Sequence, residues 1–336
     1  MSETPTVLTM GEPSGIGGEI ALKAWLMGHK ELPPFCIIDS PNRLRELCAT
    51  LGLNANVREI SNIEETANVY ENSLPVLPIK LAKDPIPGKL DVSNSPAVML
   101  AISQAVELTQ AGRANALVTN PIHKNVLYQS GFSYPGHTEY LASLVNVKTE
   151  PVMMLISERL RVIPVTRHVS IQMAIDTLTP KLIIETAVIA DKALRQDFGI
   201  ANPRIAIAAL NPHAGEGGTM GNEEKTCISP AIQFLKAKGL LVTGPMPPDT
   251  LFHRQSRDTY DVVLCMYHDQ ALIPIKTLDF DTAVNVTLGL PFVRTSPDHG
   301  TALNIAGKGL ASEKSLIAAL KVANNIAYNR SKNPHR

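Results

Sequence analysis

Short apolar runs alternate with longer amphipathic patterns along most of this chain. The apolar runs that predict strands lie at 36–38, 115–119, 152–156, 161–166, 204–210 and 261–267. Most of these runs are apolar at successive positions, as is typical of strands that are covered on both faces. Because short strands alternate with longer helical segments, the sequence predicts an α/β fold with a largely parallel sheet.

Two of the predicted helices have clear starts. Ser95-Pro96 and Thr179-Pro180 each combine a capping side chain with a proline that is tolerated in the first turn. We expect the first helix to end at Gly112. The proline-rich segment 54–95 between these elements predicts edge strands and loops rather than a long helix.

A glycine-rich loop, GEPSGIGG at 11–18, follows a predicted strand at 7–10 and precedes a predicted helix that starts near Ile20. This context is typical of phosphate-binding loops, but the spacing differs. A dinucleotide fingerprint that begins at Gly15 requires glycine where Ile20 stands, and no Gly-Lys-Ser/Thr follows. The motif therefore indicates neither a Rossmann fingerprint nor a P-loop.

Composition excludes several classes of protein. The chain has 336 residues, with 44% apolar and 18% charged residues and 31 basic against 31 acidic side chains. These values favour one large or two ordinary domains and argue against disorder and against a nucleic-acid partner. No apolar run reaches the roughly 18 residues of a membrane span, and the first residues lack the pattern of a signal peptide. We therefore expect a cytoplasmic protein with no membrane partner.

The four cysteines, Cys36, Cys48, Cys227 and Cys265, form no C-x-x-C pair. This scatter predicts buried reduced thiols rather than disulfides or a thiolate metal site.

Three histidines each stand just past the carboxyl end of a predicted strand. These are His168, His213 and His268, with separations of 45 and 55 residues. That edge of an open parallel sheet is where ligands bind. A single histidine in this position is more often a hydrogen-bonded loop residue, but three neutral imidazoles at one edge predict a divalent metal site with open positions.

Other polar residues near these strand ends are candidates for supporting roles. Asp269 follows His268 and can accept a hydrogen bond from its ring, whereas Glu216 fits a ligand role and a solvated loop charge equally well. Arg294 is enclosed by apolar neighbours, which favours a partly buried role. The segment 135–139, PGHTE, predicts a turn into a helix whose first residues could hold a phosphate.

Five motifs together resemble the 4-hydroxythreonine-4-phosphate dehydrogenase family of pyridoxal phosphate biosynthesis. They are GEPSGIGGE, YPGHTEYLA, NPHAGEGG, MYHDQALIPIK and VNVTLGLPFVRTSPDHGTALNIAGKG. The resemblance runs from about residue 6 to about residue 328. It implies two α/β/α domains around a cleft, as in isocitrate and isopropylmalate dehydrogenases, and no Rossmann domain. We accordingly predict a terminal domain of 1–125 plus 280–336 that carries the cofactor loop, and a central domain of 126–279 that carries the metal-binding histidines.

The resemblance also assigns roles to particular residues. It implies that the three histidines bind one divalent metal per active site, Zn, Mg, Mn or Co, and that the glycines at 15–18 shape a turn. It implies a homodimer with the active site at the subunit interface. The implied substrate-binding residues are His137, Thr138, Lys276, Asn285 and Arg294. The loop implied to carry NAD or NADP includes Asp298, His299, Gly300 and Asn304.

The reaction that the resemblance implies is NAD(P)-dependent oxidation of the C3 hydroxyl of 4-phosphooxy-L-threonine. Its product, 2-amino-3-oxo-4-phosphooxybutanoate, decarboxylates to 3-amino-2-oxopropyl phosphate, which leads to pyridoxine 5'-phosphate. Asp249 and Asp269 are candidates for the base or for a group that supports it.

Three alternatives remain open at this point. A dehydrogenase of a phospho-threonate or phospho-erythronate in sugar-acid catabolism would use the same chemistry. A metal-dependent hydrolase or phosphatase would use the same histidines without a nicotinamide cofactor. A small-molecule sensor would bind its ligand without turnover.

Overall fold

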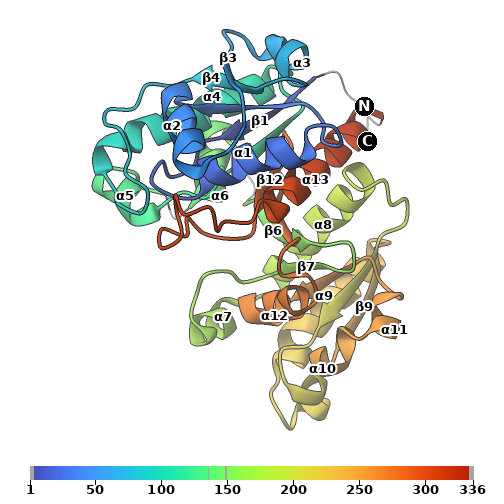
Figure 1. Cartoon of the computed structure of the whole chain (residues 1–336). Coiled ribbons are helices and arrows are strands. Elements are labelled where there is room, and N and C mark those ends of the chain that lie inside the picture. Colours follow the sequence, from blue (N-terminus) through green and yellow to red (C-terminus); the bar gives the residue numbers. More distant parts are fainter. Residues whose placement is uncertain (1–3, 135, 148–149, 333–336) are drawn as a thin grey trace. The chain divides into compact units, whose positions relative to one another are not determined.

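The structure is a computed structural model that describes residues 4–134, 136–147 and 150–332. The described chain forms two compact units (Figure 1). Unit 1 contains residues 4–151 and 290–332, and unit 2 contains residues 152–289. Pro135, which begins the predicted phosphate-binding turn, lies outside the described residues.

The unit boundaries follow Pro151 and Gly289, later in the chain than the predicted boundaries at 125 and 279. Helices α5 (Lys124–Gln129) and α6 (His137–Leu144) belong to unit 1. Leu127 and Leu141 explain this, because both are buried in the apolar cluster that covers α4 (Ser95–Gln110). At the second boundary, β11 (Val284–Leu288) pairs with β6 (Val152–Ile156) and so belongs to unit 2.

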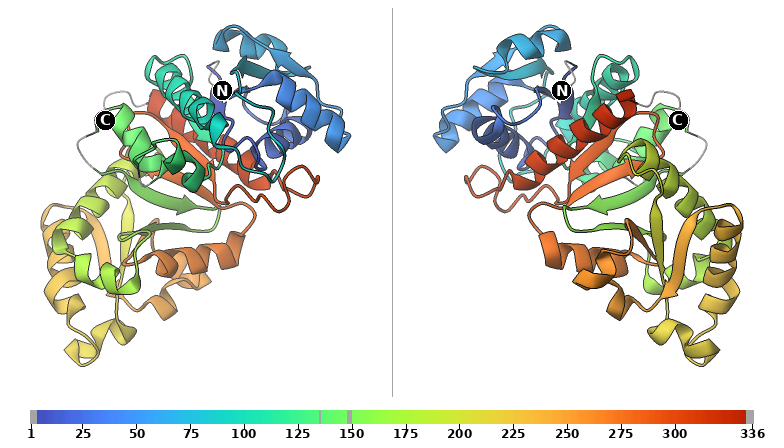
Figure 2. Two further views of the ribbon diagram at one scale, coloured as in Figure 1. Left: turned by 90° about the vertical axis from the view of Figure 1, so that its left-hand side faces the viewer. Right: turned by 90° about the vertical axis from the view of Figure 1, so that its right-hand side faces the viewer.

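Unit 1 is built on a parallel sheet with the strand order β3, β4, β2, β1, β5, β12. These strands are Thr6–Thr9 (β1), Phe35–Asp39 (β2), Val57–Glu59 (β3), Leu74–Pro78 (β4), Ala116–Thr119 (β5) and Arg294–Pro297 (β12). Its other helices are Gly17–Gly28 (α1), Pro41–Leu51 (α2), Thr66–Val69 (α3) and Lys314–Lys332 (α13). The two views of Figure 2, from opposite sides, show α4 in front of the sheet in one and α13 in front in the other. Helices thus cover both faces of the sheet, as predicted for parallel strands.

Unit 2 has the strand order β11, β6, β7, β10, β8, β9. The added strands are Arg161–Pro164 (β7), Arg204–Ala208 (β8), Leu241–Met246 (β9) and Val262–Cys265 (β10). β7, β10, β8 and β9 run parallel, whereas β6 pairs antiparallel with both β7 and β11. The helices are Ile171–Thr177 (α7), Pro180–Gln196 (α8), Ser229–Ala237 (α9), Pro248–Leu251 (α10), Arg254–Arg257 (α11) and His268–Asp279 (α12). The predicted α/β fold class is confirmed.

The predicted start of α8 is confirmed: it begins at Pro180, and the Thr179 hydroxyl accepts a hydrogen bond from Leu182 N at 3.2 Å. The predicted capping role of Ser95 is wrong, because α4 begins at Ser95 itself and its hydroxyl donates to the carbonyl oxygen of Val126 at 3.5 Å. Helix α1 begins at Gly17, before the expected Ile20. Glycine is needed at position 17 because a Cβ there would lie 2.6 Å from the carbonyl oxygen of Met10. No helix in the described part of the chain is both long and apolar enough to span a bilayer.

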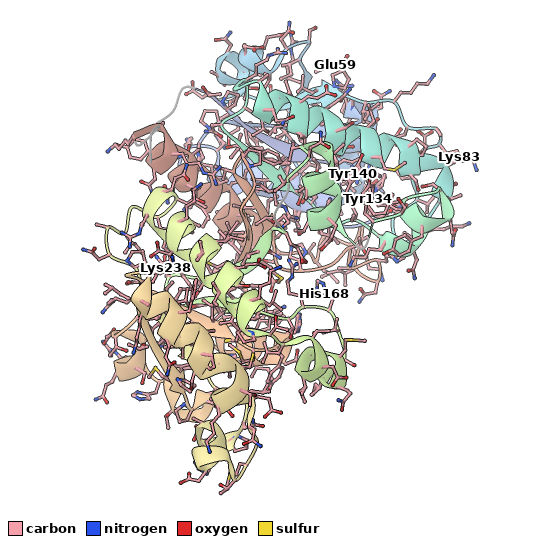
Figure 3. All side chains as sticks on the ribbon, turned by 180° about the vertical axis from the view of Figure 1, so that it is seen from behind. Glu59, Lys83, Tyr134, Tyr140, His168 and Lys238 are labelled. Atoms are coloured by element: carbon pink, nitrogen blue, oxygen red, sulfur yellow. The ribbon has the colours of Figure 1, made fainter. Side chains whose placement is uncertain are left out.

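Helix α6 is held in unit 1 by aromatic packing. The ring of Tyr140 lies 5.2 Å from the rings of Phe132 and Tyr134, measured between centroids. Figure 3 shows Tyr134 and Tyr140 beside each other at this helix. Such edge-on and tilted pairs add to the free energy gained by burying the rings, so they fix the helix whose first residue is His137.

A buried ion pair fixes the glycine loop of unit 1. Arg43 Nη1 donates to Asp39 Oδ2 at 2.5 Å, and both side chains are buried. The same guanidinium donates to the carbonyl oxygen of Pro13 through Nε at 3.1 Å and Nη2 at 2.7 Å. A Cβ at Gly18 would lie 3.0 Å from Arg43 Nη1, so glycine at this position lets the loop and the guanidinium approach each other.

We predict that Asp39→Asn destabilises the protein strongly, because it leaves the Arg43 charge buried without a carboxylate. Breaking one side of a buried ion pair costs about 3–5 kcal/mol. The matched control is Glu64→Gln, which removes the carboxylate of the exposed Arg113–Glu64 pair and should leave stability nearly unchanged. Urea unfolding followed by circular dichroism measures both variants. Equal unfolding midpoints for the two variants would contradict the prediction.

Candidate functional site

The glycine loop of unit 1 packs directly against the segment that was predicted to carry the cofactor. Ile16 N donates to the carbonyl oxygen of Thr301 at 3.1 Å, and a Cβ at Gly15 would lie 2.9 Å from the same oxygen. Gly88 N donates to the carbonyl oxygen of Ser14 at 2.8 Å, which holds the other side of the loop. The glycines therefore allow close backbone packing between the loop and residues 298–304.

The predicted cofactor residues Asp298, His299, Gly300 and Asn304 lie in an irregular segment after β12. Asp298 N donates to the Ser315 hydroxyl at 3.2 Å, and His299 Nδ1 lies 3.1 Å from the carbonyl oxygen of Gly300. The side chains of Asp298 and His299 are half-buried, whereas Asn304 and Gly300 are exposed. Their role in cofactor binding stays a prediction.

Arg294 and His137 belong to a cationic group beside the carboxyl end of β5 in unit 1. Arg294 is only 4% exposed, and its Nη2 donates to the Thr119 hydroxyl at 2.7 Å. Burial lowers the pKa of Arg294 to about 10, although the Glu139 carboxylate acts in the opposite direction. Burial, together with the charges of Arg294 and Lys124, holds the pKa of His137 well below its usual range. His137 is therefore a neutral imidazole at physiological pH.

Lys124 is a member of this group that the sequence analysis missed. It is the first residue of α5, and its Nζ lies 3.3 Å from the position that a Cβ on Gly136 would take. Glu139 Oε2 lies 3.2 Å from the same position. Two cations, one carboxylate and a neutral imidazole thus surround the start of α6, and the excess of positive charge suits an anion. The sequence could have indicated Lys124, because this residue follows the predicted strand at 115–119 by only a few positions, as the candidate histidines follow theirs.

A second polar group at the same strand ends was also missed. Glu12 is 3% exposed, and its Oε1 accepts a hydrogen bond from Ser14 N at 3.1 Å. Burial raises the pKa of Glu12, against the opposing effects of the Ser14 hydrogen bond, His123 and Arg43. Within the described residues, Asn120 Oδ1 and His123 Nδ1 are buried and make no hydrogen bond. These atoms are available to a bound ligand.

In unit 2, the structure brings two of the predicted metal ligands together. His168 follows β7, and His268 begins α12 after the parallel neighbour β10. Their ring centroids are 5.6 Å apart with an interplanar angle of 45°, and both rings line a cavity of about 150 Å³ (Figure 3 labels His168). Asp269 Oδ1 lies 2.7 Å from His268 Nδ1, as predicted for a carboxylate that orients an imidazole.

His213 is not brought to this pair. It lies in the 3₁₀ segment Pro212–Gly218, where residues 213–217 all have positive φ values between 39° and 77°. Among the residues that the structure describes, no three His, Cys, Asp or Glu side chains are grouped so that they could hold a metal ion. The three-histidine metal site therefore stays a prediction.

The remaining predicted residues of unit 2 lie in different elements. Lys276 is in the last turn of α12, with its Nζ 5.8 Å from the centroid of the Phe280 ring. Asn285 lies on β11, and its Oδ1 is buried with no hydrogen bond in the described part of the chain. Asp249 is exposed in the first turn of α10.

The loop that contains His213 also contains Glu216, which is exposed. Glu224 holds the start of this loop, because its carboxylate accepts from Leu210 N and Asn211 N at 2.8 and 2.7 Å.

We predict that Lys124→Gln raises the pKa of His137, because removing a nearby cation favours the protonated imidazole. The measurement is an NMR titration of the His137 ring. Lys181→Gln, which changes an exposed lysine of α8 in unit 2, is the control and should leave the pKa unchanged. A His137 pKa that is the same in Lys124→Gln and in the unaltered protein would show that Lys124 does not act on this imidazole.

Comparison with known proteins identifies the family. Residues 31–323 match the family described as pyridoxal phosphate biosynthetic protein PdxA. The 4-hydroxythreonine-4-phosphate dehydrogenase of Methylorubrum populi is 50% identical over 98% of this chain and 97% of its own length. The enzyme of the same name from Bradyrhizobium diazoefficiens is 50% identical over 96% of this chain and 97% of its own. A crystal structure of 4-hydroxythreonine-4-phosphate dehydrogenase from Klebsiella pneumoniae superimposes with a TM-score of 0.87 at 38% identity, covering 96% of this chain and 99% of that one. The chain belongs to the PdxA family of pyridoxal phosphate biosynthetic proteins.

Proposed function

We propose that this chain oxidises the C3 hydroxyl of 4-phosphooxy-L-threonine with NAD or NADP. The product, 2-amino-3-oxo-4-phosphooxybutanoate, then loses carbon dioxide to give 3-amino-2-oxopropyl phosphate for pyridoxine 5'-phosphate biosynthesis. The observation that carries this proposal is the 50% identity, over 98% of this chain, to a relative named 4-hydroxythreonine-4-phosphate dehydrogenase. The cationic group in unit 1 supports it, because the substrate carries a phosphate and a carboxylate.

Substrate binding in unit 1 rests on Arg294, His137, Thr138 and the newly identified Lys124. Arg294 is buried, and its Nη2 is held by the Thr119 hydroxyl. Because this side chain is already ordered, it loses little conformational entropy when an anion binds. Lys124 adds a point charge at the start of α6. Because His137 is neutral, one ring nitrogen can donate a hydrogen bond while the other accepts one. In unit 2, Lys276 and Asn285 are the proposed substrate-binding residues.

Two of the three proposed metal ligands in unit 2 are placed so that they could bind the same divalent ion. His168 and His268 lie close enough to share an ion, and Asp269 Oδ1 lies 2.7 Å from His268 Nδ1, which directs Nε2 of the ring to ligation. We propose His213 as the third ligand on the strength of the resemblance alone. A metal of the Zn, Mg, Mn or Co type, when bound, would lower the pKa of the substrate hydroxyl.

The reaction further needs a base and a nicotinamide. We propose Asp269 as the residue that keeps the His268 tautomer, and Asp249 as a candidate base for the hydroxyl proton. NAD or NADP is proposed to bind at residues 298–304, beside the glycine loop. A homodimer with its active site at the subunit interface, and a cytoplasmic location, are further parts of this proposal.

The direct test is to add 4-phosphooxy-L-threonine and NAD or NADP to the purified protein and follow the near-ultraviolet absorbance of reduced nicotinamide. We expect turnover that stops when metal is chelated and returns when a divalent metal is added. Turnover on phospho-threonate or phospho-erythronate, with none on the amine-bearing substrate, would instead support the sugar-acid dehydrogenase. Phosphate release without nicotinamide reduction would support a hydrolase.

We predict that His168→Gln and His213→Gln each abolish bound metal and turnover while the fold is retained. Each change removes an imidazole ligand, and glutamine is a poor substitute for it. His253→Gln is the matched control, since the His253 side chain is exposed, is not one of the proposed ligands, and has its Nε2 2.9 Å from the Ser256 hydroxyl. The measurements are metal content by mass spectrometry, circular dichroism and turnover. Full activity in His213→Gln would exclude His213 as a ligand.

A further inference from the structure

The amino ends of the strands in unit 2 carry a concave surface rich in arginine. Arg161 is the first residue of β7, and Asp261 immediately precedes the parallel strand β10. This edge of the sheet is therefore the one opposite to the edge of His168 and His268. A cavity of about 540 Å³ lies here, and its walls include the four arginines Arg159, Arg161, Arg254 and Arg257. We refer to it as the arginine cavity.

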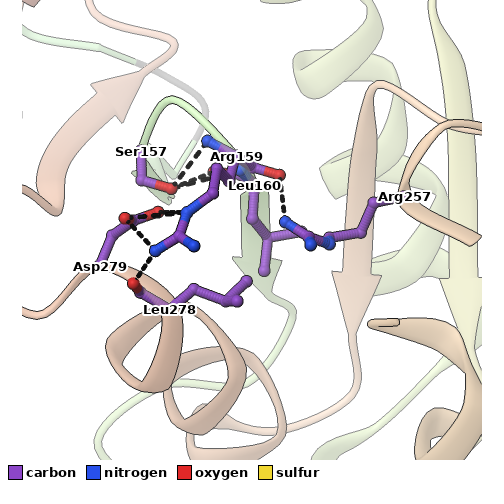
Figure 4. A network of polar contacts seen from close by, with 6 residues as sticks. All are labelled: Ser157, Arg159, Leu160, Arg257, Leu278 and Asp279. Carbon is purple, nitrogen blue, oxygen red and sulfur yellow. Dashed lines mark hydrogen bonds and ion pairs between the residues drawn. The ribbon is translucent and has the colours of Figure 1, made fainter. Parts of the chain in front are cut away.

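Two carboxylates near the arginine cavity are already bound by particular guanidinium groups. Both oxygens of Asp279 lie 3.1 Å from Arg159 Nε, and Oδ1 also accepts from Arg159 Nη2 at 2.5 Å (Figure 4). Asp261 is bound in the same manner by Arg204, through Nε at 3.2 Å and Nη2 at 3.0 Å. Arg159 and Arg204 thus have carboxylate partners at hydrogen-bonding distance, whereas Arg161 and Arg257 interact with Asp261 and Asp279 only at longer range.

Arg161 has incomplete compensation for its charge. Its Nη1 donates to the backbone carbonyl of Asp261 at 3.2 Å, and its guanidinium lies 5.2 Å from the centroid of the Phe198 ring. Its Nε is buried and makes no hydrogen bond to any described residue. Burial lowers the pKa of Arg161 by more than the Asp261 carboxylate raises it. A half-buried guanidinium of this kind is stabilised when an anion binds beside it.

Helix α11 places two more arginines at the arginine cavity. Arg257 Nη1 donates to the carbonyl oxygen of Arg159 at 3.3 Å (Figure 4), and its Nε is buried without a hydrogen bond to the described chain. Arg254 lies on the same helix and is exposed. The two other acids in the wall act on neighbouring arginines, Glu158 on Arg159 and Asp258 on Arg204. Taken together, the arginines at and beside this wall exceed the acids by one: Arg159, Arg161, Arg204, Arg254 and Arg257 against Glu158, Asp258, Asp261 and Asp279.

We propose that the arginine cavity binds a small oxyanion of the phosphate type, held by Arg161, Arg254 and Arg257. Guanidinium groups match the tetrahedral oxygens of phosphate with paired N–H donors, and several of them around a concave surface favour a phosphoryl group. The anion would join the first residue of β7 to helix α11. This site is separate from the metal-ligand candidates and does not depend on the proposed dehydrogenase activity.

The test is isothermal titration of inorganic phosphate into the full-length protein at constant ionic strength. Arg254→Gln and Arg257→Gln should each weaken one phosphate-binding event per chain about tenfold, which corresponds to about 1.4 kcal/mol. Arg45→Gln is the matched control, because Arg45 is an exposed arginine of α2 in unit 1. Binding at the cationic group around Arg294 is common to all variants and cancels in the comparison.

Identical phosphate binding by the cavity variants and the unaltered protein would overturn the proposal. Equal weakening in Arg45→Gln would also overturn it, since the effect would then be one of net charge alone. Circular dichroism shows whether each variant is folded. Arg161→Lys provides a second measure, because it keeps the charge but loses the fork of donors, and it should also weaken phosphate binding.

Discussion

The parallel direction of neighbouring strands is the constraint on which both groups of candidate residues depend. In unit 2, β7 and β10 run side by side in the same direction, so the histidines that follow them meet with their rings 5.6 Å apart. In unit 1, the parallel strands β1 and β5 bring Glu12 and Lys124 to the same edge of the sheet, and Arg294, the first residue of β12, donates to the Thr119 hydroxyl at the carboxyl end of β5. Residues that are far apart in the sequence thus become neighbours because the strands before them run in the same direction. The arginine cavity lies at the opposite edge of the sheet in unit 2.

Two buried arginines of unit 1, Arg43 and Arg294, show that a buried charge can have either a structural or a binding role. Arg43 is fully engaged by Asp39 and by the Pro13 carbonyl, so its burial fixes the glycine loop. Arg294 is equally buried, but burial dominates its electrostatics and lowers its pKa. An anion bound beside such a buried cation would raise its pKa again. This difference separates a structural arginine from one that we assign to substrate binding.

Much of the fold could be predicted from the sequence, and the reasons are physical. Uninterrupted apolar runs identified the buried strands β5, β6, β7, β8 and β10, and the proline after the capping residue Thr179 identified the start of α8. The position of α5 and α6 could not be predicted, because it depends on long-range burial of Leu127 and Leu141 against α4. The pairing of His168 with His268 follows from strand order. The placement of His213 depends on a run of positive φ values that no residue pattern indicated, since His213, Ala214 and Glu216 all adopt them without being glycine.

The central claim is that this member of the PdxA family transfers a hydride from C3 of its phosphorylated substrate to a nicotinamide. The measurement that tests it most directly uses 4-phosphooxy-L-threonine deuterated at C3, with mass spectrometry of the cofactor after turnover. The account predicts one deuterium in each reduced nicotinamide, together with release of 3-amino-2-oxopropyl phosphate. Turnover that leaves the deuterium in the product or in water, with no label in the cofactor, would contradict it.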